Sequence, residues 1–444
     1  MKSRRSVTLT LLVVLGLAAA GGRRGPELRA GGQNADKNLA RTILADKTLD
    51  KVAALAEDLL RTGFRAGDQY AEVWIRDYNS FMELACAVTP KDTLKKYLRL
   101  FFQFQELDGS ILDGVTPAGE AKGGYNYYYS PLAPEYAGHK NTVETDQESS
   151  LVQAVAAYVQ ATGDAAFLDE SIAGRTVRRR LKWALEFVRR RKMAPKYGLV
   201  YSATTQDWGD VQPEHRWGVE ADENTHWSVG IYANAMFALA LEKYIGLAKP
   251  GDPDVAALKA LRRDIAQNAM KYLWDEKKAK FIPHLYLDHS PFPADFDENA
   301  IYYHGGTSMA IQAGFLSAEQ VREANRRMLD DVKKAGADSI GLNFYPVYPK
   351  GTFLNPQVDP WSYINGGDWT WFGAYAIQNL VRYGFVREAY AEVRPMIDRT
   401  LRDGQFHEWY DRKGEGRGSA NFRGAAGTLW KAVRMLREWA KGTP

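Results

Sequence analysis

Four segments of the sequence each place an acidic side chain next to tryptophan. They are residues 74–78 (WIRDY), 204–210 (TTQDWGD), 365–371 (NGGDWTW) and 406–411 (FHEWYD). Carboxylate and guanidinium groups pair with hydroxyls, and indole faces stack against C–H surfaces. Such a combination suits the binding of a polyhydroxylated ring. Two carboxyl groups in one site could also cleave the bond between such a ring and its substituent, with one acting as general acid and the other as general base.

The second segment offers two candidates for the proton donor. Asp207 and Asp210 flank Trp208 and Gly209. A carboxyl group packed against an indole loses water, which raises its pKa toward the range of a general acid. The alternative is a tight turn closed by aspartate hydrogen bonds.

The fourth segment offers a candidate for the base. Glu408 lies between His407 and Trp409, ahead of a glycine-rich stretch, where a carboxylate could hold a water molecule. The alternative is a short hairpin with Glu408 exposed to solvent. Tyr410 belongs to the same segment and is a candidate for shaping the site.

The first and third segments offer candidates for binding. Arg76 and Asp77 beside Trp74 suit sugar hydroxyls, although Asp77 as a helix N-cap with a surface arginine is an equal alternative. In the third segment the glycines, Gly366 among them, let a ligand approach the backbone beside Asn365. Trp369 offers a stacking face there, as Trp208 does in the second segment, whereas a core position is the better interpretation for Trp371.

Helices must position these segments. Apolar residues at helical spacing predict about ten to twelve helices, near 49–63, 77–88, 92–105, 151–163, 167–191, 229–239, 254–274, 317–335, 366–383, 386–402 and 429–440. Thr145 and Glu148 predict a capping box before the fourth of these. Short strands are expected near 197–202, 281–287 and 405–411. Helical hairpins joined by long loops predict an all-α fold, an (α/α)6 toroid with short β-strands in its loops; an α-solenoid is the rival, without a visible fixed repeat.

The N-terminus resembles an export signal. Basic residues precede an apolar run from Val7 to Ala20 that ends in alanines, which is typical of a secretory signal peptide over residues 1–20. A flexible leader is expected over 21–36 and a single domain over 37–444. The formal charge of +4 falls to +1 without the signal, so nucleic acid is not an expected partner, and neither is a membrane after cleavage. The expected location is the periplasm or the exterior of the cell.

Composition and motifs exclude several chemistries. A single cysteine rules out an internal disulfide framework, and no His-x-His, HExxH, GxSxG, Walker or GxGxxG pattern occurs. We therefore predict neither a metal nor a cofactor. Residues 295–299 (DFDEN) could bind calcium, but a solvated acidic loop is the preferred interpretation.

The four segments, in this order, resemble those of the six-hairpin (α/α)6 glycosidases, which include trehalase, processing α-glucosidase I, the glycogen-debranching glucosidase and neutral invertase. The resemblance extends from about Tyr70 to Trp430. It implies that residues 74–81 grip the sugar, that the 204–210 loop carries the acid and that Glu408 is the base. The family has Ser or Thr three residues before the acid, which favours Asp207 over Asp210.

The resemblance implies a glycoside hydrolase that acts with inversion, on a substrate similar to an α-glucoside, and the N-terminal segment implies that it is exported. Asp207 would protonate the leaving oxygen, and Glu408 would activate water. Trp74, Arg76, Asp77, Trp208, Asp210, Asn365, Gly366, Trp369 and Tyr410 would contact or shape the sugar. A phosphorylase, epimerase or lyase on the same fold, and a non-catalytic carbohydrate-binding or scaffold protein, are the alternatives. The sugar, its anomer, the linkage and the oligomeric state do not follow from the sequence.

Overall fold

A closed ring of helices forms the centre of the molecule. The computed structural model describes residues 26–121 and 125–443. In the described part, each helix of the ring packs on the next, and the last packs on the first. The inner helices are α3 (Ile75–Val88), α5 (Gln147–Thr162), α7 (Ile231–Leu247), α9 (His304–Gln312), α11 (Thr370–Arg382) and α14 (Arg423–Gly442). Several of them, such as α7, are buried nearly all round, as helices in a core are.

A second layer of helices surrounds this ring and alternates with it along the chain. The outer helices are α2 (Lys47–Arg61), α4 (Lys91–Gln103), α6 (Val177–Arg191), α8 (Val255–Tyr272), α10 (Ala318–Ala335), and α12 (Val386–Glu392) followed by α13 (Arg394–Asp403). Helices such as α10 bury one stripe, including Val321 and Met328, and expose the rest. The arrangement is the predicted (α/α)6 toroid. Contact between α14 and α3 closes it, which an open solenoid would not do.

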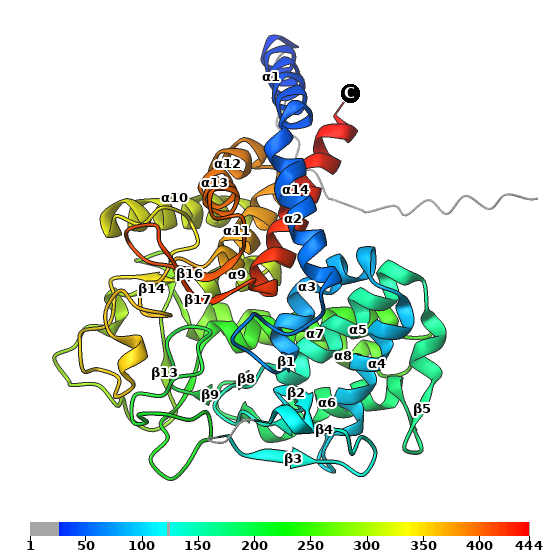
Figure 1. The fold of residues 1–444 in the computed structure, drawn as a ribbon. Helices are drawn as coiled ribbons and strands as arrows, with labels where there is room; N and C mark the ends of the chain where they lie inside the picture. The colour runs from blue at the N-terminus through cyan, green and yellow to red at the C-terminus, as the bar shows by residue number, and fades with distance from the viewer. Residues whose placement is uncertain (1–25, 122–124, 444) are drawn as a thin grey trace, which may run out of the picture.

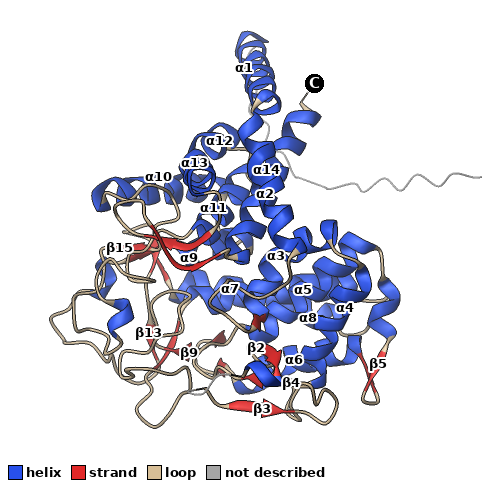
Figure 2. Cartoon of the chain, viewed as in Figure 1, coloured by secondary structure: helices blue, strands red, loops and turns tan. Residues whose placement is uncertain are grey.

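The long loops all lead from an outer helix to the N-terminus of the next inner helix. Most of the short strands lie in these loops, on one side of the helical body (Figure 2). The strands are β1 (Val73–Trp74), β2 (Gly114–Pro117), β3 (Tyr127–Tyr129), β4 (Tyr136–His139), β5 (Ser171–Ile172), β6 (Arg175–Thr176), β7 (Met193–Ala194), β8 (Leu199–Val200), β9 (Ser202–Ala203), β10 (Trp227–Val229), β11 (Trp274–Asp275), β12 (Lys280–Phe281), β13 (Leu285–Tyr286), β14 (Tyr302–Tyr303), β15 (Phe344–Tyr345), β16 (His407–Tyr410) and β17 (Gly416–Ala420). Short 3-10 turns are η1 (Ala118–Glu120), η2 (Ala165–Asp169), η3 (Glu298–Ala300) and η4 (Pro356–Val358). All strand pairs are antiparallel, and the largest sheet has the order β1-β2-β4-β3.

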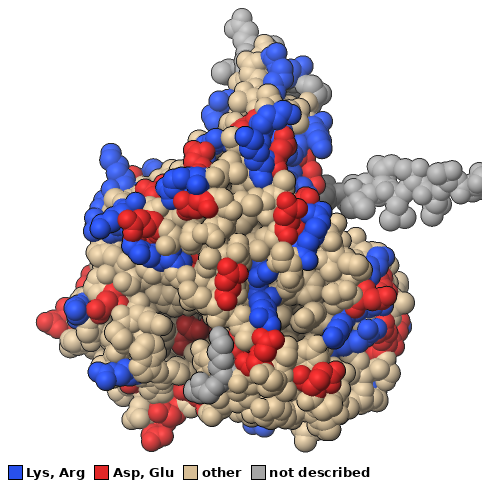
Figure 3. Space-filling model, viewed as in Figure 1, with Lys and Arg blue, Asp and Glu red and all other residues tan. Residues whose placement is uncertain are grey.

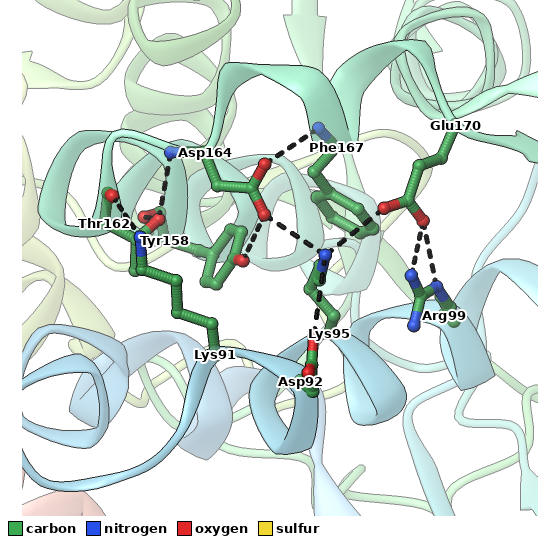
Figure 4. Close-up of polar contacts among 9 residues, drawn as sticks. All are labelled: Lys91, Asp92, Lys95, Arg99, Tyr158, Thr162, Asp164, Phe167 and Glu170. Atoms are coloured by element: carbon green, nitrogen blue, oxygen red, sulfur yellow. Dashed lines mark hydrogen bonds and ion pairs between the residues drawn. The ribbon is translucent and has the colours of Figure 1, made fainter.

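At the opposite ends of the helices the connections are short, and polar contacts hold them. Around the turn after α5, Asp164 accepts a 2.7 Å hydrogen bond from the hydroxyl of Tyr158 and lies 3.3 Å from Nζ of Lys95 (Figure 4). Glu170, just after η2, pairs with Lys95 and Arg99 of α4 (Figure 4). This cluster ties α4 to the end of α5.

Expectations for the segments at the starts of α1 and α5 differ from the structure. Helix α1 (Pro26–Ala45) occupies part of the expected flexible leader, and Leu39, Ala40 and Ile43 bury their side chains where α1 lies beside α14 (Figure 1). The capping box before α5 was wrong, because Glu148 accepts its hydrogen bond from Ile111 N instead. The expected signal peptide lies outside the described residues. In the described part, no helix combines the length and apolarity that a membrane crossing requires.

Candidate active site

A cavity of about 890 Å³ opens where the long loops meet the N-termini of the inner helices. Six carboxylates line it, which are those of Glu72, Asp77, Asp113, Glu144, Asp210 and Glu408. Aromatic side chains line the same cavity, which are those of Tyr70, Trp74, Tyr125, Trp208, Trp217, Tyr363, Trp369, Trp371, Trp409 and Phe422. The space-filling view shows a hollow on this side of the molecule with acidic atoms inside it (Figure 3). Positive helix N-termini facing the cavity favour such a concentration of carboxylates.

Glu408 is buried on strand β16, where hydrogen-bond donors hold its carboxylate. The hydroxyl of Tyr70 donates to Oε1 and the backbone N–H of Ser419 donates to Oε2, both at 2.8 Å. A Cβ atom at Gly418, whose φ is +67°, would lie 2.4 Å from Oε2, so only glycine fits there. Burial raises the pKa of Glu408 to about 7, with the charge of Asp210 acting in the same direction and these hydrogen bonds opposing the rise. The alternative of an exposed Glu408 was wrong.

The two aspartates of the 204–210 segment lie in different surroundings. Asp207 has a φ of +57°, and its side chain points to the first turn of α9. There its two carboxylate oxygens accept hydrogen bonds from Gly306 N at 2.9 and 3.1 Å. It lines a smaller cavity with Tyr232 and Tyr303 and is not among the residues that line the large one. Burial raises the pKa of Asp207 to about 8, although the hydrogen bonds from Gly306 and Gly305 oppose this.

Asp210, by contrast, lines the large cavity together with Glu408. Burial raises the pKa of Asp210, and the charge of Asp113 acts in the same direction, while Arg76 opposes it. The charge of Asp210 also acts on Glu408, which is the interaction expected of two carboxylates in one cavity. These contacts favour Asp210 over Asp207, the residue that the sequence analysis preferred.

Arg76 holds the 204–210 loop in place. Its Nε donates to Asp146 at 2.7 Å, its Nη1 donates to the backbone oxygen of Trp208 at 3.0 Å, and its Nη2 forms an ion pair with Glu144. The guanidinium also lies over the ring of Tyr232, at 5.5 Å from the centroid. The surface-arginine alternative was therefore wrong. Arg76 lines the cavity, but the protein already occupies all three of its nitrogens.

Asp77 lies in the first turn of α3 and lines the cavity. Only 5% of its surface is exposed, and its Oδ1 is buried without a hydrogen-bond partner in the protein. Burial raises the pKa of Asp77 to about 8, with Arg76 opposing and Glu408 and Asp113 reinforcing this. The N-cap of α3 is Trp74, so capping does not explain Asp77. An unpartnered buried oxygen costs stability unless a ligand satisfies it.

The other predicted residues divide into two groups. Trp74, Trp208 and Trp369 line the cavity, and Trp369 packs edge-on against Trp208 at 4.7 Å between ring centroids. Asn365, Gly366 and Tyr410 are not among the residues that line it. The side-chain amide of Asn365 forms hydrogen bonds with the backbone of Tyr348 and Val358. The ring of Tyr410 packs against the guanidinium of Arg399. These residues support the loops from behind.

Sequence reasoning missed several residues of the cavity. Tyr70, Asp113, Glu144, Tyr363 and Trp409 line it without having been singled out. Trp371 is buried at the start of α11, as expected of a core position, and it also lines the cavity. Among these residues, only Trp371 and Trp409 were marked by a sequence pattern, because they belong to the segments that pair an acidic side chain with tryptophan. Within residues 26–121 and 125–443, no group of three or more His, Cys, Asp and Glu side chains is placed to hold a metal ion. In the 295–299 loop, Asp295 and Asp297 are exposed to solvent as expected, whereas Glu298 is largely buried and accepts hydrogen bonds from Tyr286 and Tyr348.

Comparisons with known proteins give a fold but no relative by sequence. No family model matches the chain, and no curated protein matches it. Solved structures do match. A GH63 mannosylglycerate hydrolase from Thermus thermophilus, in complex with glucose, has a TM-score of 0.60 at 15% identity, over 86% of this chain and 99% of the other. A rhamnosidase from Klebsiella oxytoca with rhamnose bound has a TM-score of 0.58 at 16% identity, over 88% of this chain and 64% of the other.

A third structure, described as a wild-type glycosidase, has a TM-score of 0.54 at 15% identity, over 88% of this chain and 97% of the other. Identities of this size support conclusions about architecture only. The chain has the (α/α)6 fold of the six-hairpin glycosidases.

Proposed function

We propose that the protein is an exported glycoside hydrolase that inverts the configuration of the anomeric carbon. The observation that carries the proposal is the presence of Asp210 and Glu408 in one cavity lined with tryptophan. Hydrolysis with inversion needs one carboxylic acid to protonate the leaving oxygen and one carboxylate to deprotonate water on the opposite side of the sugar. The fold, shared with structures described as hydrolases and glycosidases, supports this interpretation.

The surroundings of the two carboxyls support a division of roles. Glu408 accepts two hydrogen bonds, and such donors favour the carboxylate form that a base needs. Burial and the like charge of Asp113 raise the pKa of Asp210 against the opposing charge of Arg76, and a raised pKa favours the protonated form that an acid needs. We therefore assign Asp210 as general acid and Glu408 as general base, in place of the pair Asp207 and Glu408.

The reacting sugar would lie against Asp77, whose free Oδ1 can accept a hydrogen bond from a hydroxyl. Trp74 would face its C–H surfaces, whereas Trp369 is almost fully buried and supports the cavity wall. Two of the similar structures contain glucose or rhamnose, so a neutral hexose is the working substrate. An α-glucoside is the first choice because of the resemblance of the motifs.

Little supports a phosphorylase. Such an enzyme needs a cation for phosphate beside the acid, and His215 and Arg216 are the candidates that follow Asp207 and Asp210 in the sequence. His215 contacts Gln212 and Asp222 instead, and neither His215 nor Arg216 lines the cavity. Among the described residues that line it, Arg76 is the one lysine or arginine, and its nitrogens are engaged. Export rests on the N-terminal sequence alone, and recovery of the processed protein from the periplasm or medium would test it.

The test of the function is a screen of purified protein against α- and β-linked disaccharides and aryl glycosides. Proton NMR of the first product would report its anomer. We expect release of a sugar whose anomeric configuration is opposite to that of the substrate, without added phosphate, and loss of that activity in Glu408→Gln. A product that retains configuration would refute the inverting mechanism. Binding of sugars without any product would favour the non-catalytic alternative.

A further inference from the structure

We propose that Trp217 and Tyr125 form the binding site for the leaving group, and that this leaving group is an uncharged sugar ring. The inference rests on the proposed function and specifies its substrate. Both side chains line the cavity, yet 58% of Trp217 and 48% of Tyr125 are exposed. Large aromatic surfaces left open beside an acid-lined cavity are typical of sites that stack a sugar ring.

The exposed fractions of the lining residues distinguish the closed end of the cavity from the end that opens to solvent. Glu408 and Asp77 are 4% and 5% exposed, so the reacting sugar lies at the closed end. Trp217 is far more exposed and lies on the loop that also carries Asp210. Because a general acid contacts the oxygen between the reacting sugar and its leaving group, a residue beyond it toward solvent faces the leaving group.

The two aromatic residues come from different loops that are fastened to one another. Asn126 Nδ2 donates to Glu220 Oε1 at 2.9 Å, which joins the segment after Tyr125 to the segment after Trp217. The loop with Trp217 is also fixed to Thr142, whose N–H donates to Val219 O and whose hydroxyl accepts from Ala221 N. Preorganised contact surfaces lose less conformational entropy when a ligand binds.

The ring of Tyr125 is supported from behind. It packs edge-on against His139 at 4.9 Å between centroids, and His139 packs against Trp74 at 5.1 Å. The same aromatic cluster thus connects the proposed leaving-group site to the site of the reacting sugar. A ring stacked at the mouth would continue this apolar surface.

The charge of the cavity selects against acidic leaving groups. Six carboxylates line it, whereas the guanidinium of Arg76, the one lysine or arginine among the described lining residues, is bound to Asp146, Glu144 and the Trp208 carbonyl. An additional carboxylate on the substrate would meet repulsion from those of the six acids that are ionised, and among the described lining residues no lysine or arginine is free to pair with it. A neutral ring avoids this cost.

The experiment compares Trp217→Ala with wild type on two kinds of substrate. The panel consists of the neutral α-linked disaccharides of glucose and of mannose, and of the α-fluorides of the same sugars. A fluoride leaves without stacking contacts, so the variant should lose about tenfold more kcat/KM on the disaccharide than on the fluoride. Tyr129→Ala is the matched control, because Tyr129 is 65% exposed on β3 near Tyr125 and is not among the lining residues.

A matched pair of substrates tests the charge. Glucosylglycerol and glucosylglycerate differ by one carboxylate, and we expect kcat/KM at least about tenfold higher for the neutral member. The inference would be overturned if Trp217→Ala lost kcat/KM equally on disaccharide and fluoride, or lost none on either. It would also be overturned if wild type preferred glucosylglycerate. The proposed function would stand in each of these cases. A wild-type protein that cleaves none of these compounds, and none of the α- and β-linked glycosides of the screen above, would refute the proposed function, and the leaving-group site with it.

Discussion

The hydroxyl of Tyr70 donates a 2.8 Å hydrogen bond to Oε1 of Glu408, although 338 residues separate the two in the sequence. Tyr70 lies in the loop that leads into α3, and Glu408 lies in the loop that leads into α14. These two inner helices pack on each other and close the ring. The environment of the proposed base therefore depends on closure of the toroid.

The first prediction concerns Tyr70→Phe. Burial raises the pKa of Glu408 to about 7, and the Tyr70 hydrogen bond holds it below the value that burial alone would give. A base works when deprotonated, so the rate should rise with pH through a midpoint near 7 in wild type. Removal of a hydrogen bond to a charged group costs about 1.5–3 kcal/mol, which corresponds to about one to two pH units. The acidic limb of kcat/KM should shift upward by about that amount. An unshifted limb would show that Glu408 does not control it.

The second prediction concerns stability. The pKa of Glu408 is higher in the folded protein than its usual 4.5, so folding takes up a proton. The stability that this proton uptake contributes is present in full below pH 4.5 and is lost as the pH rises through 7. Glu408→Gln removes this loss, so the variant should be more stable than wild type at pH 8, by about 1–3 kcal/mol, and should show less difference at pH 5. Denaturant unfolding at the two pH values measures the effect, and a variant less stable at pH 8 would contradict it.

The third prediction separates the two aspartates. Asp210→Asn should lose about two to four orders of magnitude in kcat on substrates with poor leaving groups, because general acid catalysis contributes roughly that much. With a glycosyl fluoride, whose leaving group needs no full proton transfer, the loss should be much smaller. Asp207→Asn is the matched control, since its amide oxygen can still accept from Gly306 N.

Parallel kinetics on both substrates decide between the assignments. If Asp207→Asn shows the large loss and the fluoride rescue while Asp210→Asn does not, the acid is Asp207 as the sequence suggested. Circular dichroism of both variants controls for unfolding, because Asp207 also holds the N-terminus of α9.

Much of the helical framework was predictable because the outer helices are amphipathic. Helix α10 buries one stripe and carries the Ser317 capping box, so periodicity located it well. The inner helix α9 was missed, because its residues from His304 to Ile311 are buried on all sides and give no period. Residues 386–402 were expected as one helix, whereas the chain breaks at Val393 into α12 and α13, with a proline in the first turn of α13.

The site was predictable to the level of loops but not of atoms. Tryptophan beside carboxylate identified the segments of Trp74, Trp208 and Trp369, and all three line the cavity. The choice between Asp207 and Asp210 lay beyond the sequence, since both flank the same tryptophan. The left-handed backbone at Asp207 and the N–H of Gly306 direct the first carboxylate to α9, and neither feature leaves a trace in residue spacing.

The last prediction concerns Arg76→Lys. Arg76 neutralises Asp146 and Glu144 while it holds the carbonyl of Trp208, two residues before Asp210. Burial strongly raises the pKa of Glu144, and the charge of Arg76 opposes that rise. A lysine keeps one charge but cannot reach three partners with a planar fork.

Loss of a partner from a buried ion pair costs about 3–5 kcal/mol, so Arg76→Lys should unfold at a lower temperature than wild type. Because the 204–210 loop is no longer held, kcat should also fall by more than the loss of stability explains. Glu144→Gln separates the two effects, because it breaks the pair but leaves the Trp208 contact intact. It should destabilise the protein while preserving more of kcat than Arg76→Lys does. Equal kcat in the two variants would mean that the Trp208 carbonyl contact does not position the acid.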